Sequence, residues 1–313
     1  MENRFQKVLV TGGAGFIGSH LVRELVGTGW SVVVLDDFSS GKVENLGGFV
    51  GADGLKVVRG DVRDRKIVDE VLGGVEAVVH LAGFVDSAES VRRPLFTHDV
   101  NVSGTLNVLD ACVQNGVGRL VFASSAAVYG DGNPLPLREE YDLRPTSPYA
   151  ASKVSAEFYC KMFGNCYGLN SVVLRFFNVY GLGQGTNPYA GVITKFVSSG
   201  LRGEPLTVYG DGTQTRDFVN VKDVVEAVVK ALSFKSSRTE VFNVCSGTSI
   251  SINALTRYVC KVLGKDLEIV HAAAREGDVL HSYGDPTKTQ KVLMFNAQVD
   301  FEDGLSRLVG SLV

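Results

Sequence analysis

Short apolar runs alternate with longer segments of helical periodicity through the first 180 residues of the chain. Runs rich in Val and Leu predict buried strands, and apolar residues spaced three and four apart predict helices between several of them. The predicted strands are residues 7–11, 31–36, 55–59, 76–81, 119–124 and 170–176. The predicted helices are residues 16–26, 65–72, 100–114 and 149–167. This alternation predicts a parallel sheet with helices on both faces and a ligand site at the carboxyl ends of its strands.

The pattern becomes less regular after Gly181, where Gly and Pro separate shorter segments. The predicted strands here are residues 203–208, 216–220 and 241–244, and the predicted helices are residues 223–234 and 252–263. We therefore predict an α/β fold of the Rossmann type, a doubly wound parallel sheet with a smaller C-terminal α/β substrate-binding lobe. Residues 1–180 are expected to form the sheet domain, and residues 181–313 mainly the lobe. Since no clean linker separates them, the chain is expected to cross between two parts that share a cleft.

Composition and charge narrow the class of protein. With 313 residues, 45% of them hydrophobic, the chain can build one large α/β unit or a large domain with a smaller one attached. A formal net charge of -3 argues against a nucleic-acid binder. No apolar run reaches the roughly 18 residues that span a membrane, and the polar residues 1–7 lead into a strand without a signal peptide. Five scattered cysteines without a CxxC pair are typical of reduced thiols, so we expect a cytoplasmic protein without a structural metal.

A glycine cluster follows the first predicted strand and opens the first predicted helix. It reads Thr-Gly-Gly-Ala-Gly-Phe-Ile-Gly over residues 11–18. Gly12, Gly15 and Gly18 allow a tight turn, close approach of the backbone to a pyrophosphate, and close packing of the helix on the strand. The free N–H groups at the start of the helix would face the anion. The cluster therefore predicts a dinucleotide site.

Acidic residues and small residues end the next strands. Asp36 lies about 20 positions after the glycines, where a carboxylate accepts the ribose hydroxyls and repels a 2'-phosphate. This favours NAD over NADP, although a surface Asp at a strand end would look the same. Asp61 ends the third strand and could either meet the adenine or cap a helix. The sequence Leu-Ala-Gly at residues 81–83 provides small residues where a cofactor needs close backbone approach.

Three side chains are candidates for acid–base chemistry. Tyr149 and Lys153 are four residues apart in a predicted helix, so they share one face, and the positive charge of Lys153 would lower the pKa of the Tyr149 phenol. A phenol tuned in this way can remove an alcohol proton while hydride leaves the same carbon. The fifth strand ends in Ser124 and Ser125, whose hydroxyls could relay that proton or simply face solvent in a turn. The combination with a dinucleotide motif carries more weight than any one of these residues.

An ordered set of motifs covers the chain nearly from end to end. The motifs are VTGGAGFIGSHL (10–21), LDDFSSGK (35–42), GDVRD (60–64), HLAG (80–83), FASSAAVYGD (122–131), SPYAASK (147–153), LRFFNVYG (174–181), VYGDGTQTRDFVNVKDV (208–224) and REGDV (275–279). In these motifs the sequence resembles the extended short-chain dehydrogenase/reductases, and within them the UDP-glucose (UDP-galactose) 4-epimerases.

The resemblance implies roles for individual residues. Ser125 and Tyr149 would form the catalytic hydroxyl pair, and Lys153 would hold both Tyr149 and the nicotinamide ribose. The residues implied around the cofactor NAD are Gly12, Gly15, Phe16, Ile17, Gly18, Asp36, Asp37, Ser39, Gly41, Asp61, Val62, Leu81, Ala82, Gly83, Asn101, Ser124, Tyr149 and Lys153. The residues implied around the UDP-sugar are Ser87, Ser125, Tyr149, Asn178, Gly191, Val192, Tyr209, Arg216, Arg275, Asp278 and Ser282. Two arginines suit a diphosphate, but Arg216 and Arg275 could instead form surface salt bridges with nearby Asp residues.

The residues before the Val-Tyr-Gly of residues 128–130 separate the reactions within this family. Related dehydratases carry an Asp-Glu pair there, and many decarboxylases carry a Glu, whereas this chain has Ala126 and Ala127. Without a carboxyl group, elimination of water lacks its obvious catalyst, so a UDP-sugar 4-epimerase that oxidises and re-reduces C4 is favoured. The alternatives are a UDP-glucuronate 4-epimerase, a reductase or a dehydratase of the same family, or a catalytically silent NAD-binding regulator.

The choice of sugar and the assembly state are also expectations from the resemblance. A small residue at Ser282 would leave room for an N-acetyl group beside C2 of the sugar, although the neighbouring Tyr283 could be the limiting wall. The family likeness implies a homodimer joined through residues 100–114 and 149–167. The apolar surplus of those two helices could equally pack against the sheet.

Overall fold

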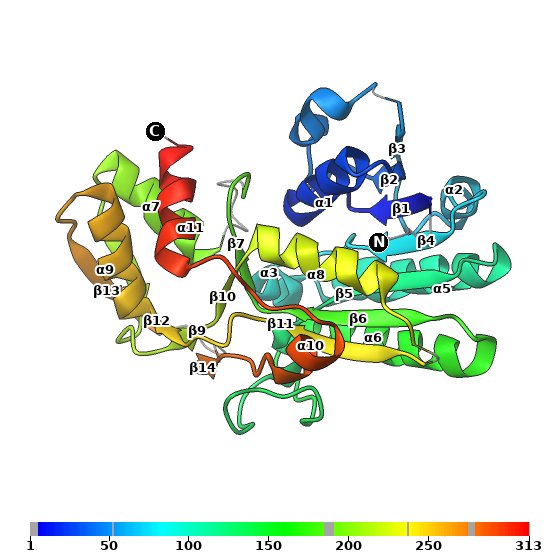
Figure 1. Cartoon of the computed structure of the whole chain (residues 1–313). Coiled ribbons are helices and arrows are strands. Elements are labelled where there is room, and N and C mark those ends of the chain that lie inside the picture. Colours follow the sequence, from blue (N-terminus) through cyan, green and yellow to red (C-terminus); the bar gives the residue numbers. More distant parts are fainter. Residues whose placement is uncertain (1–5, 52, 185–190, 237, 275–278, 313) are drawn as a thin grey trace.

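A parallel sheet of seven strands forms the centre of the molecule (Figure 1). The computed structural model describes residues 6–51, 53–184, 191–236, 238–274 and 279–312. The sheet order is β11-β6-β5-β4-β1-β2-β3, and every pairing in it is parallel. Its strands are β1 (Lys7–Thr11), β2 (Ser31–Asp36), β3 (Leu55–Arg59), β4 (Ala77–His80), β5 (Arg119–Ser125), β6 (Ser171–Phe176) and β11 (Glu240–Val244). The predicted Rossmann-type fold is confirmed, and the predicted strands differ from these by at most one residue at either end.

Helices cover both faces of this sheet because successive residues of each buried strand point to opposite sides. Val8 and Val10 of β1 belong to one apolar cluster, whereas Leu9 belongs to the other. The first cluster is completed by helices α1 (Phe16–Gly27) and α8 (Val221–Ser233). The second is completed by α2 (Arg65–Val71), α5 (Gly104–Gln114) and α6 (Pro148–Tyr167). The strand order reverses beside β1, so the loops after β1 and β4 meet at the carboxyl edge of the sheet.

Helix α6 carries the predicted Tyr and Lys, and its ends are fixed by local chemistry. Ser147 is its N-cap, with its hydroxyl accepting the Ala150 amide at 3.1 Å, and Pro148 occupies the first turn. The helix ends at Gly168, which has a left-handed φ of 72°. The helix predicted at residues 100–114 is the second half of a longer helical segment that begins at Pro94. Helix α4 (Pro94–His98) runs through a single π-helical turn, η2 (Asp99–Ser103), into α5.

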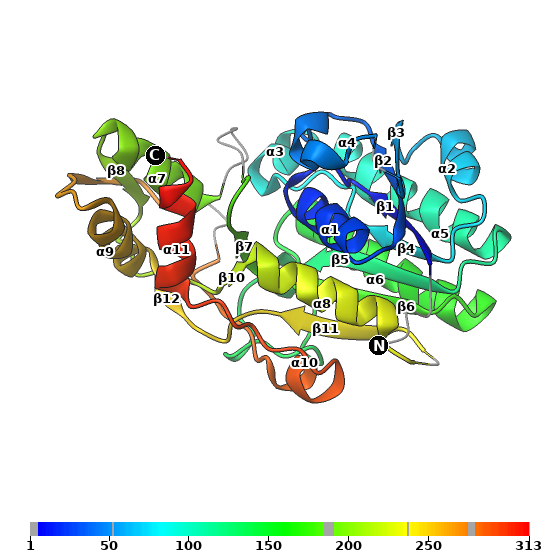
Figure 2. The same cartoon turned by 45° about the horizontal axis from the view of Figure 1, so that its top comes forward.

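The C-terminal lobe lies beside the sheet domain and combines small sheets with three helices (Figure 2). Its helices α7 (Val192–Arg202), α9 (Ile252–Leu263) and α11 (Phe301–Gly310) share one apolar core. Its strands are β8 (Leu206–Tyr209) with β13 (Ile269–Ala272), and β9 (Thr215–Arg216) between β12 (Ile250–Ser251) and β14 (His281–Ser282). The short strands β7 (Asn178–Tyr180) and β10 (Phe218–Asn220) pair where the lobe meets the sheet domain. The chain returns from the lobe to add α8 and β11 to the sheet domain.

Two sequence predictions in the lobe are wrong. The strand predicted at residues 203–208 begins only at Leu206, because Gly203 ends helix α7 with a left-handed φ of 71°. The strand predicted at 216–220 is broken at Asp217, whose side chain is fully buried. The Asp217 carboxylate accepts hydrogen bonds from the amides of Ser246, Gly247 and Gly284 at 2.8, 2.9 and 3.2 Å. It therefore ties together two loops and divides the predicted strand into β9 and β10.

Candidate active site

The glycine cluster forms the tight turn that its sequence predicts. Gly12 has a φ of 68°, and an added Cβ there would lie 2.7 Å from the Ala82 nitrogen, so the turn packs directly on the loop after β4. A Cβ on Gly18 would lie 2.2 Å from the Gly12 carbonyl oxygen, which requires glycine where α1 approaches the turn. No side chain caps α1 at Gly15. The N–H groups of its first turn, which include Phe16 and Ile17, are therefore placed for an external anion such as a pyrophosphate.

The loop after β2 closes on this turn and buries the acidic residue at its start. Each oxygen of the Asp36 carboxylate accepts one backbone amide at 2.9 Å, from Ala14 and from Phe38. Burial raises the pKa of Asp36 above its ordinary value, and these two hydrogen bonds oppose that effect. Gly41 lies against the turn, since an added Cβ would be 2.7 Å from the Ala14 carbonyl carbon. The carboxylate retains lone pairs for two ribose hydroxyls, so the residues present fit NAD.

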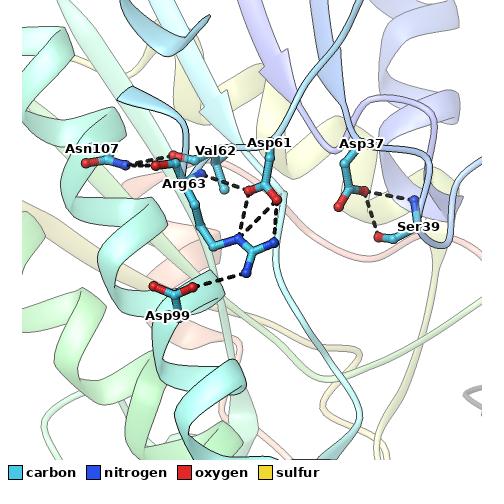
Figure 3. A network of polar contacts seen from close by, with 7 residues as sticks. All are labelled: Asp37, Ser39, Asp61, Val62, Arg63, Asp99 and Asn107. Atoms are coloured by element: carbon cyan, nitrogen blue, oxygen red, sulfur yellow. Dashed lines mark hydrogen bonds and ion pairs between the residues drawn. The ribbon is translucent and has the colours of Figure 1, made fainter. Parts of the chain in front are cut away.

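Asp61 is held by an arginine that the sequence prediction did not include. The Arg63 guanidinium binds the Asp61 carboxylate with an NH2–Oδ2 distance of 2.6 Å, and its other terminal nitrogen donates to Asp99 at 3.0 Å. Figure 3 shows Arg63 between these two carboxylates, with Asp37 accepting from Ser39 on the adjacent loop. The hydrogen bond from Arg63 lowers the pKa of Asp61. Asp61 is therefore an ionised acceptor at neutral pH, and the helix N-cap is the neighbouring Asp64.

The three catalytic candidates come together at the ends of β5 and α6. The hydroxyls of Ser125 and Tyr149 are hydrogen-bonded to each other. The Lys153 ammonium is buried and donates to the Ala123 carbonyl oxygen at 2.8 Å. In addition, the Ser125 hydroxyl accepts the Ala127 amide at 3.1 Å, which orients it at the start of the turn η3 (Ala126–Tyr129).

The predicted lowering of the Tyr149 pKa does not hold in this structure. Burial raises the pKa of Tyr149, and only the hydrogen bond with Ser125 acts in the opposite direction. Lys153 does not counter the effect of burial here, because its Nζ is directed at the Ala123 carbonyl. Burial also lowers the pKa of Lys153 to about 8, and electrostatic interactions with Cys160 and then with Glu157 partly oppose this. The lysine therefore still carries its proton at neutral pH.

Gly83 leaves open the space in front of these groups. A Cβ at Gly83 would lie 3.1 Å from Asn101 Oδ1 and 3.4 Å from Lys153 Nζ. Because glycine has no Cβ, a cradle stays open beside the lysine. Asn101 lines this cradle but is fully engaged by protein groups. It accepts the Phe84 amide at 2.7 Å and donates to the Phe84 carbonyl and the Ser152 hydroxyl, each at 2.9 Å. Asn101 thus fixes the loop after β4 against α6.

The lobe brings two of the predicted substrate residues side by side. Ser282 of β14 pairs in register with Arg216 of β9. Arg216 donates to the carbonyl oxygens of Thr215 and Leu280 at 2.8 and 3.3 Å, which sets the guanidinium along this strand pair. Asn178 lies on the neighbouring segment, where its amide donates to the Asp217 carbonyl at 2.9 Å. The alternative of an Arg216–Asp217 salt bridge receives no support, because the Asp217 carboxylate is occupied by three backbone amides and the Ser246 hydroxyl.

The other predicted substrate residues are more dispersed. Ser87 begins the helix α3 (Ser87–Arg92), which touches α6 where the Ser90 hydroxyl accepts the Tyr149 amide at 3.1 Å. Gly191 and Val192 form the uncapped start of α7. Tyr209 ends β8 and is 39% exposed. Arg275 and Asp278 lie outside the described residues.

Sequence reasoning missed a buried ionic network behind the catalytic residues. Arg175 on β6 pairs with Glu157 on α6, and both side chains are more than nine-tenths buried. Ser124, predicted beside the cofactor, directs its hydroxyl to Glu157 at 2.5 Å instead. A signal for this network was present in the sequence. Arg175 interrupts an apolar strand and Glu157 follows Lys153 by one helical turn, and a buried charge requires a partner.

Comparisons with known proteins agree with this geometry. The family model described as the NAD dependent epimerase/dehydratase family matches residues 8–245. UDP-glucose 4-epimerase of Mycolicibacterium smegmatis is 37% identical over 97% of this chain and 97% of its own length. The structure of UDP-N-acetylglucosamine 4-epimerase from Methanobrevibacter ruminantium superposes with a TM-score of 0.94 at 38% identity, over 98% of both chains. UDP-glucose 4-epimerase from Thermotoga maritima gives 0.93 at 37% identity, also over 98% of both.

The chain belongs to the NAD dependent epimerase/dehydratase family. The resemblance found in the sequence and the choice of NAD as cofactor are thereby confirmed. The chain is an enzyme of the isomerase class: several of its relatives are named UDP-glucose 4-epimerases, although a decarboxylase and a 4,6-dehydratase are also similar to it. Within the described ranges no helix is long and apolar enough to cross a membrane, and no group of three or more His, Cys, Asp or Glu side chains could hold a metal ion.

Proposed function

We propose that this enzyme is a 4-epimerase of UDP-sugars, acting on UDP-galactose and UDP-glucose and also on the N-acetylated pair. The observation that carries the proposal is the hydrogen-bonded Ser125–Tyr149 pair beside a buried Lys153, at the edge of the sheet where the glycine turn lies. Ala126 and Ala127 follow Ser125 in η3 and bring no carboxyl group to this point. This supports epimerisation over elimination of water, because epimerisation needs no acid or base beyond the C4 hydroxyl partner.

The protein's own residues supply the proton transfer. Tyr149, assisted by Ser125, accepts the proton of the C4 hydroxyl as hydride leaves C4. It returns this proton after the 4-keto sugar has rotated to present its other face. NAD, when bound, supplies the hydride acceptor and later the donor, so that no external oxidant is consumed. Because burial raises the pKa of Tyr149, the phenolate that accepts the proton needs a positive charge nearby. The Lys153 ammonium, which donates to the Ala123 carbonyl in this structure, is proposed to provide this charge in the complex with NAD and substrate.

The lobe is proposed to anchor the nucleotide while the sugar moves. Arg216 and Asn178 lie on adjoining segments that Asp217 fixes in place, and a guanidinium suits a diphosphate. The 4-keto sugar rotates about this anchor and presents its other face for reduction. The small side chain of Ser282, next to Arg216, supports room for an N-acetyl group at C2. Residues 1–180 would then carry NAD and the catalytic groups, and residues 181–313 mainly the sugar nucleotide.

Two further properties belong to the same proposal. The enzyme is proposed to act in the cytoplasm, in galactose metabolism or in the supply of glycan precursors. It is also proposed to be a homodimer joined through α5 and α6. Phe158 supports this, since it is 60% exposed on α6 although phenylalanine is usually buried.

Proton NMR tests the reaction directly. Purified protein is mixed with UDP-galactose without added cofactor, and the anomeric signals are followed over time. Appearance of UDP-glucose up to a fixed ratio supports the 4-epimerase with retained NAD. A parallel sample with UDP-N-acetylgalactosamine tests the second sugar pair. If neither substrate changes even after NAD is added, the proposal fails, and a uronic acid substrate or a silent NAD-binding role becomes the better account.

A further inference from the structure

We propose that Glu157 is a positioning residue that holds the Ser125-bearing end of β5 on helix α6 and supplies the negative charge that balances the Lys153 ammonium. The proposal deepens the epimerase function above and rests on it. Glu157 touches neither the substrate nor the cofactor in this scheme, so it would act through Ser124 and Lys153.

Three consecutive residues of β5 each contact one residue of a single stripe along α6. The Ala123 carbonyl accepts from Lys153 at 2.8 Å, and the Ser124 hydroxyl donates to Glu157 at 2.5 Å. Ser125 is hydrogen-bonded to Tyr149. Positions 149, 153 and 157 are four apart and therefore share one face of the helix. The Ser124–Glu157 contact thus belongs to the same joint as the two catalytic contacts.

Arg175 fixes the Glu157 carboxylate from the neighbouring strand. Arg175 lies opposite Ser124 in the β5–β6 register. Its Nε donates to Glu157 Oε1 at 3.0 Å and its NH2 to Oε2 at 2.7 Å, a two-point pairing that leaves the carboxylate little freedom. Oε1 therefore accepts from both Ser124 and Arg175. The carboxyl ends of β5 and β6 are joined to α6 through this one group.

The same arginine reaches the turn that follows Ser125. Its NH1 donates to the Tyr129 hydroxyl at 2.9 Å, and Tyr129 in turn donates to Asn243 Oδ1 of β11 at 2.6 Å. Tyr129 ends η3, which begins immediately after Ser125. The segment on both sides of Ser125 is therefore held by one buried network, at Ser124 before it and at Tyr129 after it.

A buried ion pair is not by itself a strong source of stability, because removing two charges from water costs about as much as their attraction returns. Apolar side chains of similar volume would fill this space equally well. What the pair provides is directional contact with Ser124, together with a negative charge one turn from Lys153. Both are properties that the proposed reaction uses.

The groups around Lys153 leave Glu157 as its source of negative charge among the described residues. On β4, burial lowers the pKa of His80 to about 3, so this ring is neutral. On α6, burial raises the pKa of the Cys160 thiol and of the Tyr149 phenol, so both keep their protons near neutral pH. On β5 the lysine faces the Phe122 ring, with Nζ 4.9 Å from its centroid. Cys160 and Glu157 both oppose the effect of burial on the pKa of Lys153, and of these two only Glu157, which is paired with Arg175, is a carboxylate.

The test separates this role from simple support of the fold. The single variant Glu157→Gln leaves Arg175 as an unpaired buried charge and is expected to be strongly destabilised. The double variant Glu157→Gln/Arg175→Gln removes both charges and keeps two amides that can hydrogen-bond. Thermal unfolding and the pH profiles of kcat and KM are measured for each. In the double variant we expect an unfolding temperature near that of the wild type, kcat lowered at least about 10-fold, and KM changed less than about twofold. We also expect its activity to be lost at a lower alkaline pH, because Glu157 raises the pKa of Lys153 and Arg175 is not among the groups that shift this pKa.

Two further variants resolve the two parts of the role. Glu157→Asp keeps the negative charge on a shorter side chain. The alkaline limb of its kcat–pH profile should therefore lie closer to that of the wild type than in the double variant, while kcat stays low. Ser124→Ala removes one contact and no charge, so kcat should fall severalfold with the alkaline limb unmoved. A stably folded double variant with wild-type kcat and pH profile would overturn the proposal. An unchanged kcat in Ser124→Ala would overturn its positioning part.

A readout without turnover keeps this test independent of the proposed reaction. Lysine labelled with 13C at Cε is titrated by NMR, and the Lys153 signal is assigned by its loss in Lys153→Met. The wild-type midpoint should lie near pH 8, and the midpoint of the double variant should be lower. Equal midpoints would contradict the charge-balancing part even in a protein that epimerises none of the sugars tested. Absence of wild-type turnover with a shifted midpoint would count against the proposed function alone.

Discussion

The ammonium group of Lys153 donates a hydrogen bond to the carbonyl oxygen of Ala123 at 2.8 Å, in a site where the lysine is only 4% exposed. The lysine is thus held against the sheet and also kept out of water. Burial lowers its pKa from 10.5 to about 8. The folded protein therefore binds this proton less tightly than the unfolded chain does, and the buried charge costs stability wherever both states are protonated.

Replacing Lys153 should stabilise the protein while removing its activity. A pKa lowered from 10.5 to about 8 corresponds to roughly 3 kcal/mol, against about 1 kcal/mol for the lost hydrogen bond to Ala123. Lys153→Met is therefore expected to unfold with a free energy about 1–2 kcal/mol higher at pH 7. The gain should shrink as the pH rises from about 8 toward 10.5, because the wild-type lysine then loses its charge in the folded state.

Urea unfolding at pH 7 and pH 10 measures this gain. The exposed Lys161 lies on the same helix, so Lys161→Met serves as the matched control and should change stability little. A Lys153→Met protein less stable than the wild type at pH 7 would show that the buried charge does not cost stability.

Loss of the Tyr149 hydroxyl should remove the acid–base step without removing the cofactor. Tyr149→Phe keeps the ring in place, so we expect kcat to fall at least about 100-fold with NAD still bound. Turnover and the NAD content of the purified protein are measured together. Tyr167→Phe, at a 58% exposed position on the same helix, is the control and should leave kcat unchanged. Near-normal turnover in Tyr149→Phe would assign the proton transfer to another group.

The Asp61–Arg63 pair predicts how the protein reads the adenine base. An ionised Asp61 accepts hydrogen bonds and donates none, so it favours the 6-amino group of adenine over the 6-keto group of hypoxanthine. Cofactor-depleted protein is expected to bind NAD at least about 10-fold more tightly than its hypoxanthine analogue. Asp61→Asn should narrow this ratio, because an amide can both donate and accept. Calorimetric titration of the two cofactors gives the ratio, and equal ratios in wild type and variant would remove Asp61 from adenine recognition.

Enlarging Ser282 should separate the two sugar pairs. Ser282 pairs with Arg216 in the lobe, so a tyrosine there would reduce the space proposed for an N-acetyl group. Ser282→Tyr is expected to lower kcat/KM for UDP-N-acetylgalactosamine at least about 10-fold, with UDP-galactose affected much less. Steady-state kinetics on both substrates measures the change. If kcat/KM for UDP-N-acetylgalactosamine is unchanged in Ser282→Tyr but altered in Tyr283→Phe, then Tyr283 is the side chain that limits the space beside C2 of the sugar.

Local patterns were sufficient for the sheet domain because its strands are apolar on both faces and its helices keep one apolar stripe. Strands β1 and β2 begin and end at the predicted residues for this reason, and the edge strand β3 does so although its Lys56 and Arg59 are exposed. The placement of Asp36 and Ser125 at one edge of the sheet also follows from topology, since parallel strands align their carboxyl ends.

Long-range contacts account for what the sequence did not predict. Asp217 breaks a strand because loops more than 25 residues away along the chain bind its carboxylate. Arg63 links Asp61 to Asp99, which lies 36 residues after Arg63 along the chain. The Glu157–Arg175 pair joins a helix to a strand 18 residues later. Each requires knowledge of which buried polar groups meet in space, and periodicity does not carry that information.

The most direct test of the central claim follows the hydrogen on C4 itself. UDP-galactose carrying deuterium at C4 is converted in ordinary water without added cofactor, and the product is analysed by NMR and mass spectrometry. Transient oxidation and re-reduction at the Tyr149 site predicts UDP-glucose that keeps the deuterium at C4, with none released to solvent. Product that has lost the label to water would contradict hydride transfer to a retained cofactor and would require inversion by proton exchange.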